Sequence, residues 1–269
     1  MLKSNPEKDK NNSARKILKR QLGNLPSVEY YYCQMNQPIK KIIVLVHGIS
    51  RNAEEIMRSF SQVIDDTSLL VAPVFSREYA RDYQRLGRKG KGPRADYILQ
   101  SILNELKDEY DCKLRKINLF GFSAGAQFSH RFAFAHPHLI DKVAIVAAGW
   151  YTLPSKALDY PMGLKLNGEF TDVQFELARI SRIKFRVYIG EKDYLRDKSL
   201  NKNKKIDRLQ GKNRIERAKN WIDLMRIQAE KQHISNAIKL ELLPSVAHDF
   251  TDANNQSEIC TKVYEWFIK

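Results

Sequence analysis

The sequence predicts an α/β fold: a doubly wound, mostly parallel sheet of about eight strands, with helices on both faces and a small cap insertion. Three observations lead to this fold class. Short apolar runs alternate with segments of helical period along most of the 269 residues. Several of these runs are apolar without alternation, as expected for strands buried on both faces of a parallel sheet. The length suits one large domain, and 43% hydrophobic residues are enough for its core.

The elements follow from composition and period, taken in chain order. The predicted strands are residues 28–34, 40–46, 69–75, 117–120, 143–147, 184–190 and 238–243. The predicted helices are residues 52–60, 94–110, 124–135, 214–233 and 257–268. Asn52 is the expected N-cap of the first helix. The charged stretch 192–213 is expected to be a flexible loop.

The predicted domain organisation is simple. Residues 1–25 are basic and polar and are expected to form a flexible segment; they contain no apolar core of a secretory signal. Residues 26–269 form a single domain, with an irregular, cap-like excursion at about 150–182 that contains Pro154 and Pro161. No apolar run reaches the length of a membrane span.

One stretch carries the strongest chemical signal. Residues 121–125 read Gly-Phe-Ser-Ala-Gly, between a predicted strand and a glycine-poor helix. This G-x-S-x-G pattern is typical of a nucleophile elbow, a strained turn that projects the Ser123 hydroxyl above the sheet. Gly121 and Gly125 are expected to let the strand and the helix approach closely.

Two further residues complete a catalytic constellation. Ser123, Asp193 and His248 each follow a predicted strand, so they meet at the carboxyl edge of a parallel sheet. Serine needs an imidazole to take its proton, and the imidazole needs a carboxylate to orient it. Asp197 is the alternative acid. The other candidates are weaker: His136, His138 and His233 lie at helix ends, and Asp249 and Asp252 follow His248 too closely to orient it.

Acyl transfer also needs donors for the developing oxyanion. The expected donors are the backbone N–H groups of Ala124, directly after the nucleophile, and of Ile49, in the loop after the strand that ends in His47-Gly48. His47 is expected to have a structural role in that turn, because His248 already supplies the base.

Charge and cysteine content limit the possible partners and compartment. Lys and Arg number 46 against 31 Asp and Glu, a net charge of +15, and the basic residues gather in the N-terminal segment and in residues 77–94 and 192–217. A solvated basic surface is the favoured interpretation; no nucleic-acid partner is expected, and an anionic substrate or membrane headgroup is the alternative. Cys33, Cys112 and Cys260 show no metal or disulfide spacing, which favours a reducing cytoplasm.

Together, these motifs resemble the α/β-hydrolase superfamily over about residues 28–269. The resemblance implies the doubly wound sheet, the Ser-Asp-His triad and no cofactor or metal. Residues 127–132 and 148–152 look like bacterial poly(3-hydroxybutyrate)-depolymerase-like and acetyl-esterase-like hydrolases. The charged insert after Asp193 departs from the compact superfamily pattern. Trp150 and Tyr151 are expected to overlie the site, either as ordinary packing or as the lining of an acyl pocket.

The leading functional hypothesis is a serine hydrolase that cleaves a small carboxylic ester through an acyl-enzyme. The same machinery hydrolyses amides and thioesters, so a peptidase or thioesterase is an alternative. A non-catalytic binding protein that has kept the fold is a second alternative, and an anion or nucleic-acid binder is a third. Nothing in the sequence indicates the oligomeric state.

Overall fold

The computed structural model describes residues 15–236 and 238–269. It contains one eight-stranded sheet in the order β1-β2-β4-β3-β5-β6-β7-β8. The strands are β1 (Ile17–Leu22), β2 (Leu25–Cys33), β3 (Lys41–Val46), β4 (Ser68–Val74), β5 (Ile117–Phe122), β6 (Ile140–Val146), β7 (Lys184–Gly190) and β8 (Lys239–Leu243). β1 and β2 form an antiparallel hairpin, β2 is antiparallel to β4, and all other pairs are parallel. The predicted fold class is confirmed.

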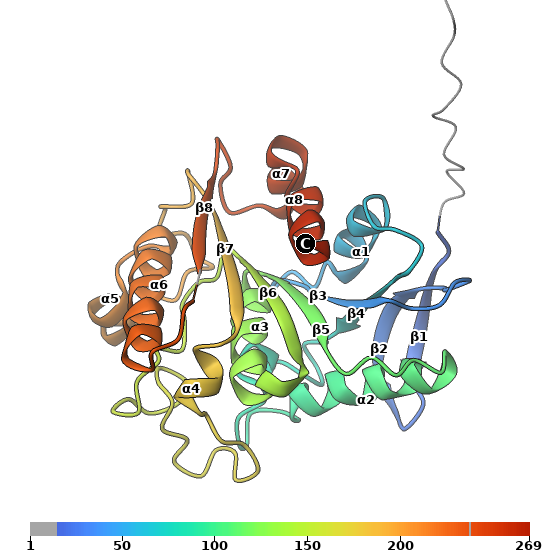
Figure 1. Ribbon diagram of the computed structural model, residues 1–269. Coiled ribbons are helices and arrows are strands. Elements are labelled where there is room, and N and C mark those ends of the chain that lie inside the picture. The colour runs from blue at the N-terminus through green and yellow to red at the C-terminus, as the bar shows by residue number, and fades with distance from the viewer. Residues whose placement is uncertain (1–14, 237) are drawn as a thin grey trace, which may run out of the picture.

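Helices cover both faces of this sheet (Figure 1). One face carries α1 (Ala53–Ser61), α7 (Phe250–Ser257) and α8 (Ile259–Ile268). The other carries α2 (Ala95–Glu109), α3 (Ala124–Ala135), α6 (Arg214–Lys231) and the short α4 (Leu177–Ile180). The remaining helical turns are α5 (Lys204–Gln210), η1 (Tyr83–Arg85) and η2 (Pro137–Leu139).

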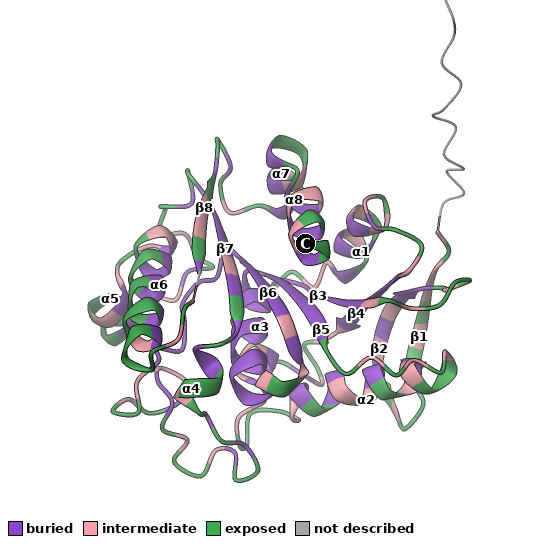
Figure 2. Ribbon diagram, in the orientation of Figure 1, coloured by how far each residue is buried: buried purple, intermediate pink, exposed green. Residues whose placement is uncertain are grey.

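The core lies along the central strands. Figure 2 shows β3 and β5 as buried, whereas β1, β2 and β8 carry exposed residues. All residues of α3 are buried, so the helix behind Ser123 is enclosed on every side. The chain winds outward in opposite directions from β3 and β5, which makes this the switch point where open α/β sheets bind ligands.

Two local expectations were wrong. The segment 1–25 was expected to be flexible, but Ile17–Leu22 pairs with β2, and Arg20 donates to Tyr32 and Glu109; residues 1–14 lie outside the described part. The stretch 192–213 contains α5, which is held by ion pairs. Asn52 is the N-cap residue of α1, as predicted, but its side chain makes no capping hydrogen bond: Nδ2 donates to Glu55 (2.7 Å) and Oδ1 accepts from Ser50 (3.1 Å).

The excursion after β6 packs beside the α2 and α3 layer. Thr152 Oγ1 accepts a hydrogen bond from the buried Arg131 of α3 (2.9 Å), and Asp172 accepts one from Arg94 (2.7 Å). Tyr160 donates to the carbonyl of Arg85 (2.8 Å). The excursion therefore covers the side of the domain that α3 lines.

In the described part of the chain, no helix is long and apolar enough to cross a membrane.

Candidate active site

Ser123 lies at a sharp turn between β5 and α3. Its backbone has φ 54° and ψ −110°, a conformation that a non-glycine residue adopts only when its surroundings enforce it. Two hydrogen bonds hold it there: Ser123 N–H donates to Val146 O (2.8 Å), and Ser123 O accepts from Gln127 N–H (3.2 Å). This is the geometry expected of a nucleophile elbow.

The two glycines of the motif are required by space. A Cβ on Gly121 would lie 2.4 Å from the carbonyl oxygen of Gly125, and a Cβ on Gly125 would lie 2.1 Å from the carbonyl oxygen of Val46. Both contacts are with backbone atoms that cannot move aside. β3, β5 and α3 can thus approach closely only where side chains are absent.

Ser123, His248 and Asp193 form one chain of hydrogen bonds. Ser123 Oγ lies 3.0 Å from His248 Nε2, and His248 Nδ1 lies 2.8 Å from Asp193 Oδ2. The carboxylate is an acceptor, so it holds the imidazole proton on Nδ1 and leaves Nε2 free to accept the serine proton. Phe122 stacks on the imidazole at a centroid distance of 5.4 Å and fixes its plane.

The second oxygen of Asp193 has a partner that the sequence reasoning missed. Arg214, the first residue of α6, donates from one guanidinium nitrogen to Asp193 Oδ1 (2.9 Å). Both side chains are 1% exposed, so this is a buried ion pair. The available signal was weak: an arginine at a helix start within a segment already crowded with basic residues.

The loop after β3 is rigidly held beside the serine. The buried ring of His47 contacts the Gly48 carbonyl through Nδ1 (2.8 Å) and accepts from Phe75 N–H through Nε2 (2.9 Å). Tyr83 donates to the carbonyls of both His47 (2.9 Å) and Gly48 (3.0 Å). Burial lowers the pKa of His47 to about 4, so this histidine is a neutral structural group.

The two expected oxyanion donors follow β3 and β5, which are neighbouring strands. Within residues 15–236 and 238–269, neither Ile49 N–H nor Ala124 N–H donates a hydrogen bond. Ala124 begins α3, whose N-terminus adds the positive end of a helix dipole.

A cavity of about 370 Å³ opens over the serine. Its described lining combines apolar side chains, small polar groups and two carboxylates, and contains no lysine or arginine: Gly48, Ile49, Ser50, Asn52, Glu55, Phe122, Ser123, Ser199, His248, Asp249, Phe250 and Thr251. Glu55 accepts hydrogen bonds from Asn52 and Thr251, both of them neutral.

Trp150 and Tyr151 lie elsewhere. Neither is among the described residues that line this cavity. Trp150 stacks on the guanidinium of Arg131 (4.3 Å), and Tyr151 stacks on Trp221 with a centroid distance of 4.8 Å. Gln210 of α5 holds the Tyr151 backbone through both its N–H and its C=O. The structure therefore gives these two aromatic residues packing roles.

The alternative candidates do not reach the serine–imidazole pair. Asp197 accepts from Arg214 and from Ser199 instead of from His248. His136 pairs with the buried Asp96 (2.7 Å), an interaction that joins α3 to α2. Among the described residues, no group of three or more His, Cys, Asp or Glu side chains is arranged to hold a metal ion.

Fold and site together define an α/β-hydrolase fold that carries a serine, histidine and aspartate in hydrogen-bonded order. Two solved structures are similar over most of the chain. One is LpqC, a poly(3-hydroxybutyrate) depolymerase from Bordetella parapertussis (24% identity, 94% of this chain and 89% of that one, TM-score 0.76). The other is poly(aspartic acid) hydrolase-1 from Sphingomonas sp. KT-1 (21% identity, 88% and 93%, TM-score 0.74).

A more distant neighbour is FphF, a fluorophosphonate-binding serine hydrolase of Staphylococcus aureus (11% identity, 95% of this chain and 99% of that one, TM-score 0.60). At these identities the likeness establishes the fold. The sequence matches no protein-family model and no curated protein.

Proposed function

We propose that this protein is a serine hydrolase that cleaves a carboxylic ester. The observation that carries the proposal is the unbroken hydrogen-bond chain from Ser123 through His248 to Asp193, set on a strained elbow. A serine in ordinary packing needs neither the strain nor the oriented imidazole.

The mechanism follows from the positions of these atoms. Ser123 Oγ attacks the acyl carbonyl carbon while His248 Nε2 takes its proton, and Asp193 stabilises the imidazolium. The N–H groups of Ile49 and Ala124 stabilise the oxyanion. His248 then protonates the departing alkoxide, which leaves an acyl-serine. Water attacks that ester with His248 as base, and the acid leaves as Ser123 regains its proton.

The cavity favours a neutral acyl group. Ile49, Phe122 and Phe250 offer apolar surface, while Glu55 and Asp249 disfavour a nearby carboxylate of the substrate. An uncharged ester is therefore favoured over a polyanion such as poly(aspartic acid). Amide or thioester cleavage on the same machinery, and a binding protein without turnover, are the alternatives.

The test is labelling with a fluorophosphonate and mapping of the modified residue, together with hydrolysis of p-nitrophenyl esters of increasing acyl length. We expect the label on Ser123. We expect Ser123→Ala to lower kcat by roughly 10⁴-fold or more with an unchanged unfolding temperature. Ser129→Ala changes a buried serine of α3, the helix that follows Ser123, and this variant should still be labelled.

Full esterase activity in Ser123→Ala would contradict the assignment of the nucleophile. A folded wild-type protein that neither takes the label nor hydrolyses any ester, amide or thioester would favour the binding-protein alternative. Faster cleavage of poly(aspartic acid) than of neutral esters would overturn the substrate class.

A further inference from the structure

The support of the catalytic acid comes from a single buried arginine. Arg214 Nη1 lies 2.9 Å from Asp193 Oδ1 and 3.2 Å from Asp197 Oδ2. Its Nη2 lies 2.6 Å from Ser199 Oγ. One guanidinium thus joins Asp193, Asp197 and Ser199, all on the segment that follows β7.

The Asp193 carboxylate depends on this contact for its orientation. His248 occupies Oδ2, and within the described chain Arg214 is the one hydrogen-bond donor to Oδ1. Without it, a buried carboxylate would keep a single partner and could rotate about its χ2 bond. The two contacts together, Arg214 on Oδ1 and His248 on Oδ2, fix the position and the plane of the carboxylate.

We propose that Arg214 is a positioning residue of the catalytic site: it fixes Asp193, and through Asp193 the imidazole of His248. The inference rests on the proposed function, since it concerns the same three residues. Arg214 contacts neither Ser123 nor the cavity directly, so it acts through Asp193.

Arg214 also connects the acid to the wall of the cavity. Ser199 lines the cavity over Ser123 and accepts a hydrogen bond from Arg214, while Asp197 accepts from both the N–H and the hydroxyl of Ser199 (2.7 Å each). The loop that shapes one side of the cavity is therefore anchored on the guanidinium that orients the triad.

The charged groups around His248 determine in which direction a substitution should shift the pH profile. The titratable groups that face the pair are Asp193, Arg214 and Asp197 on the β7 and α6 side, Tyr151 after β6, and Asp249 and Glu55 at the cavity. Burial raises the pKa of Tyr151, so it stays neutral.

Asp197 is the second charge that matters. Although partial burial opposes ionisation, hydrogen bonds from Ser199 and Arg214 hold the pKa of Asp197 well below its usual value. The Arg214 cation and the Asp197 anion therefore act on a nearby imidazolium with opposite signs.

The experiment measures the acid limb of kcat/KM and, independently, the NMR titration of the His248 imidazole. In Arg214→Met we expect kcat to fall about 10- to 100-fold with a smaller change in KM. We expect the acid limb to move up by roughly one pH unit, because a cation has left the imidazole's surroundings.

In Asp197→Asn the acid limb should move down, because an anion has been removed. Arg214→Lys should keep the limb near its wild-type position and still lower kcat, because an ammonium cannot hold the same partners.

Arg217→Met is the matched control. Arg217 lies on the first turn of the same helix, is equally buried, and donates to Gly149 O (2.6 Å) and to Asp207 (2.7 Å) instead of to Asp193. The Arg217→Met substitution should destabilise the fold but leave the acid limb of kcat/KM in place.

If Arg214→Met and Arg217→Met shift the acid limb of the pH profile equally, Arg214 has only a structural role. If the acid limb stays in place in both Arg214→Met and Asp197→Asn, the proposal is wrong. If Arg214→Met does not fold, Asp197→Asn and Arg214→Lys carry the test. The NMR titration needs no turnover, so a protein without hydrolase activity would reject the proposed function while the coupling of Arg214 to His248 is still measured.

Discussion

His47 is the residue outside the triad through which pH should act on stability. Its ring is fully buried and neutral, with a pKa lowered by burial to about 4, whereas an exposed histidine in the unfolded chain titrates near 6.5. Between these values the unfolded chain binds the extra proton. The free energy of unfolding should therefore fall as the pH drops from about 6.5 to about 4, and His47 should account for about 3 kcal/mol of that loss.

Urea unfolding at several pH values across this interval measures the effect. His47→Gln keeps an acceptor for Phe75 N–H but does not titrate, so its stability should decline less steeply than that of the wild type. His130, also buried with a lowered pKa, contributes in the same direction and remains in the variant. Parallel pH profiles for the two proteins would contradict the prediction.

The triad and its support differ in how far a sequence can predict them. Ser123, Asp193 and His248 could be proposed because each follows a strand and the chain order is characteristic; the structure brings them within hydrogen-bond distance. Arg214 could not, because its role depends on where α6 begins relative to Asp193. Trp150 and Tyr151 follow β6, so the sequence predicts that they overlie the site, as ordinary packing or as the lining of an acyl pocket; the structure gives them packing contacts with Arg131 and Trp221.

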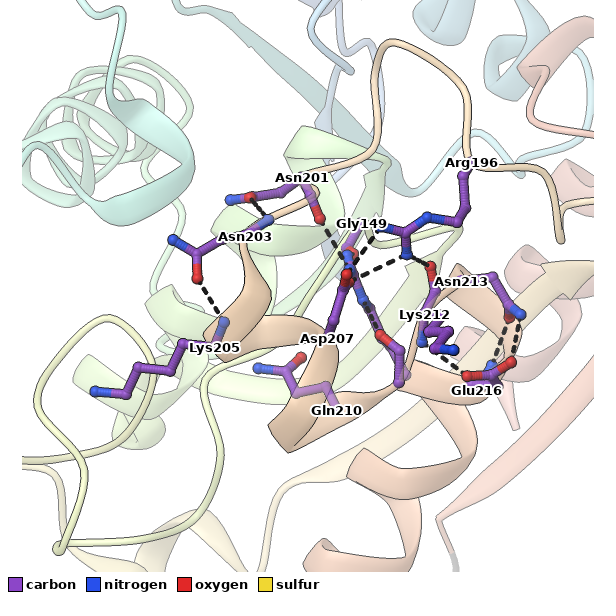
Figure 3. Close-up of polar contacts among 12 residues, drawn as sticks. Gly149, Arg196, Asn201, Asn203, Lys205, Asp207, Gln210, Lys212, Asn213 and Glu216 are labelled. Atoms are coloured by element: carbon purple, nitrogen blue, oxygen red, sulfur yellow. Dashed lines mark hydrogen bonds and ion pairs between the residues drawn. The ribbon is translucent and has the colours of Figure 1, made fainter.

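At the scale of elements, the residues that cap the N-terminus of α6 should contribute measurably to the free energy of unfolding. Asn213 caps this helix: its side chain accepts from Glu216 N–H (2.9 Å), and Glu216 in turn accepts from Asn213 and from Lys212 N–H (Figure 3). This arrangement is related to a capping box, but the Glu216 carboxylate accepts from the backbone N–H of Lys212 instead of that of the N-cap residue Asn213.

Asn213→Ala should lower the free energy of unfolding by about 1 kcal/mol. Asn213→Ser keeps an acceptor for Glu216 N–H and places no charge beside the Glu216 carboxylate, so it should retain most of the stability. Chemical denaturation of both variants checks this prediction. A loss as large in Asn213→Ser as in Asn213→Ala would show that the cap is not the stabilising contact.

The elements missed by sequence share a physical reason. β1 reads Ile-Leu-Lys-Arg-Gln-Leu and lies at the sheet edge, so it buries too little apolar surface to show a pattern. α5 and α7 are short helices, and few of their residues are buried. α5 is held by charge: Asp207 pairs with Arg196 (2.8 Å; Figure 3). Asp207 also pairs with Arg217. From its composition alone, this segment is predicted to be a solvated basic loop.

At the scale of the whole molecule, the arginines of the two basic segments are less available to a partner than their number indicates. In the basic segment 77–94, Arg85 and Arg88 both pair with Asp82, and Arg94 pairs with Asp96 and Asp172. In 192–217, the arginines at 196, 214 and 217 are also paired with aspartates. Most arginines in these two segments therefore form ion pairs within the fold instead of presenting an unpaired charge to a partner.

We accordingly expect duplex DNA to bind weakly, with a dissociation constant above roughly 10 µM at physiological salt. Fluorescence anisotropy of a labelled duplex, measured over a range of salt concentrations, tests this. Submicromolar binding that persists at physiological salt would contradict this prediction and favour the nucleic-acid alternative. The exposed lysines would then be the first residues to substitute.

The hairpin of β1 and β2 bears on how the protein could be used. β1 is the last strand at one edge of the sheet, with β2, β4 and β3 between it and β5, which carries Ser123. A surface tether or fusion partner joined on the N-terminal side of β1 would therefore attach at the far margin of the domain from the nucleophile. A protein immobilised in this way would keep the cavity over Ser123 accessible from solution.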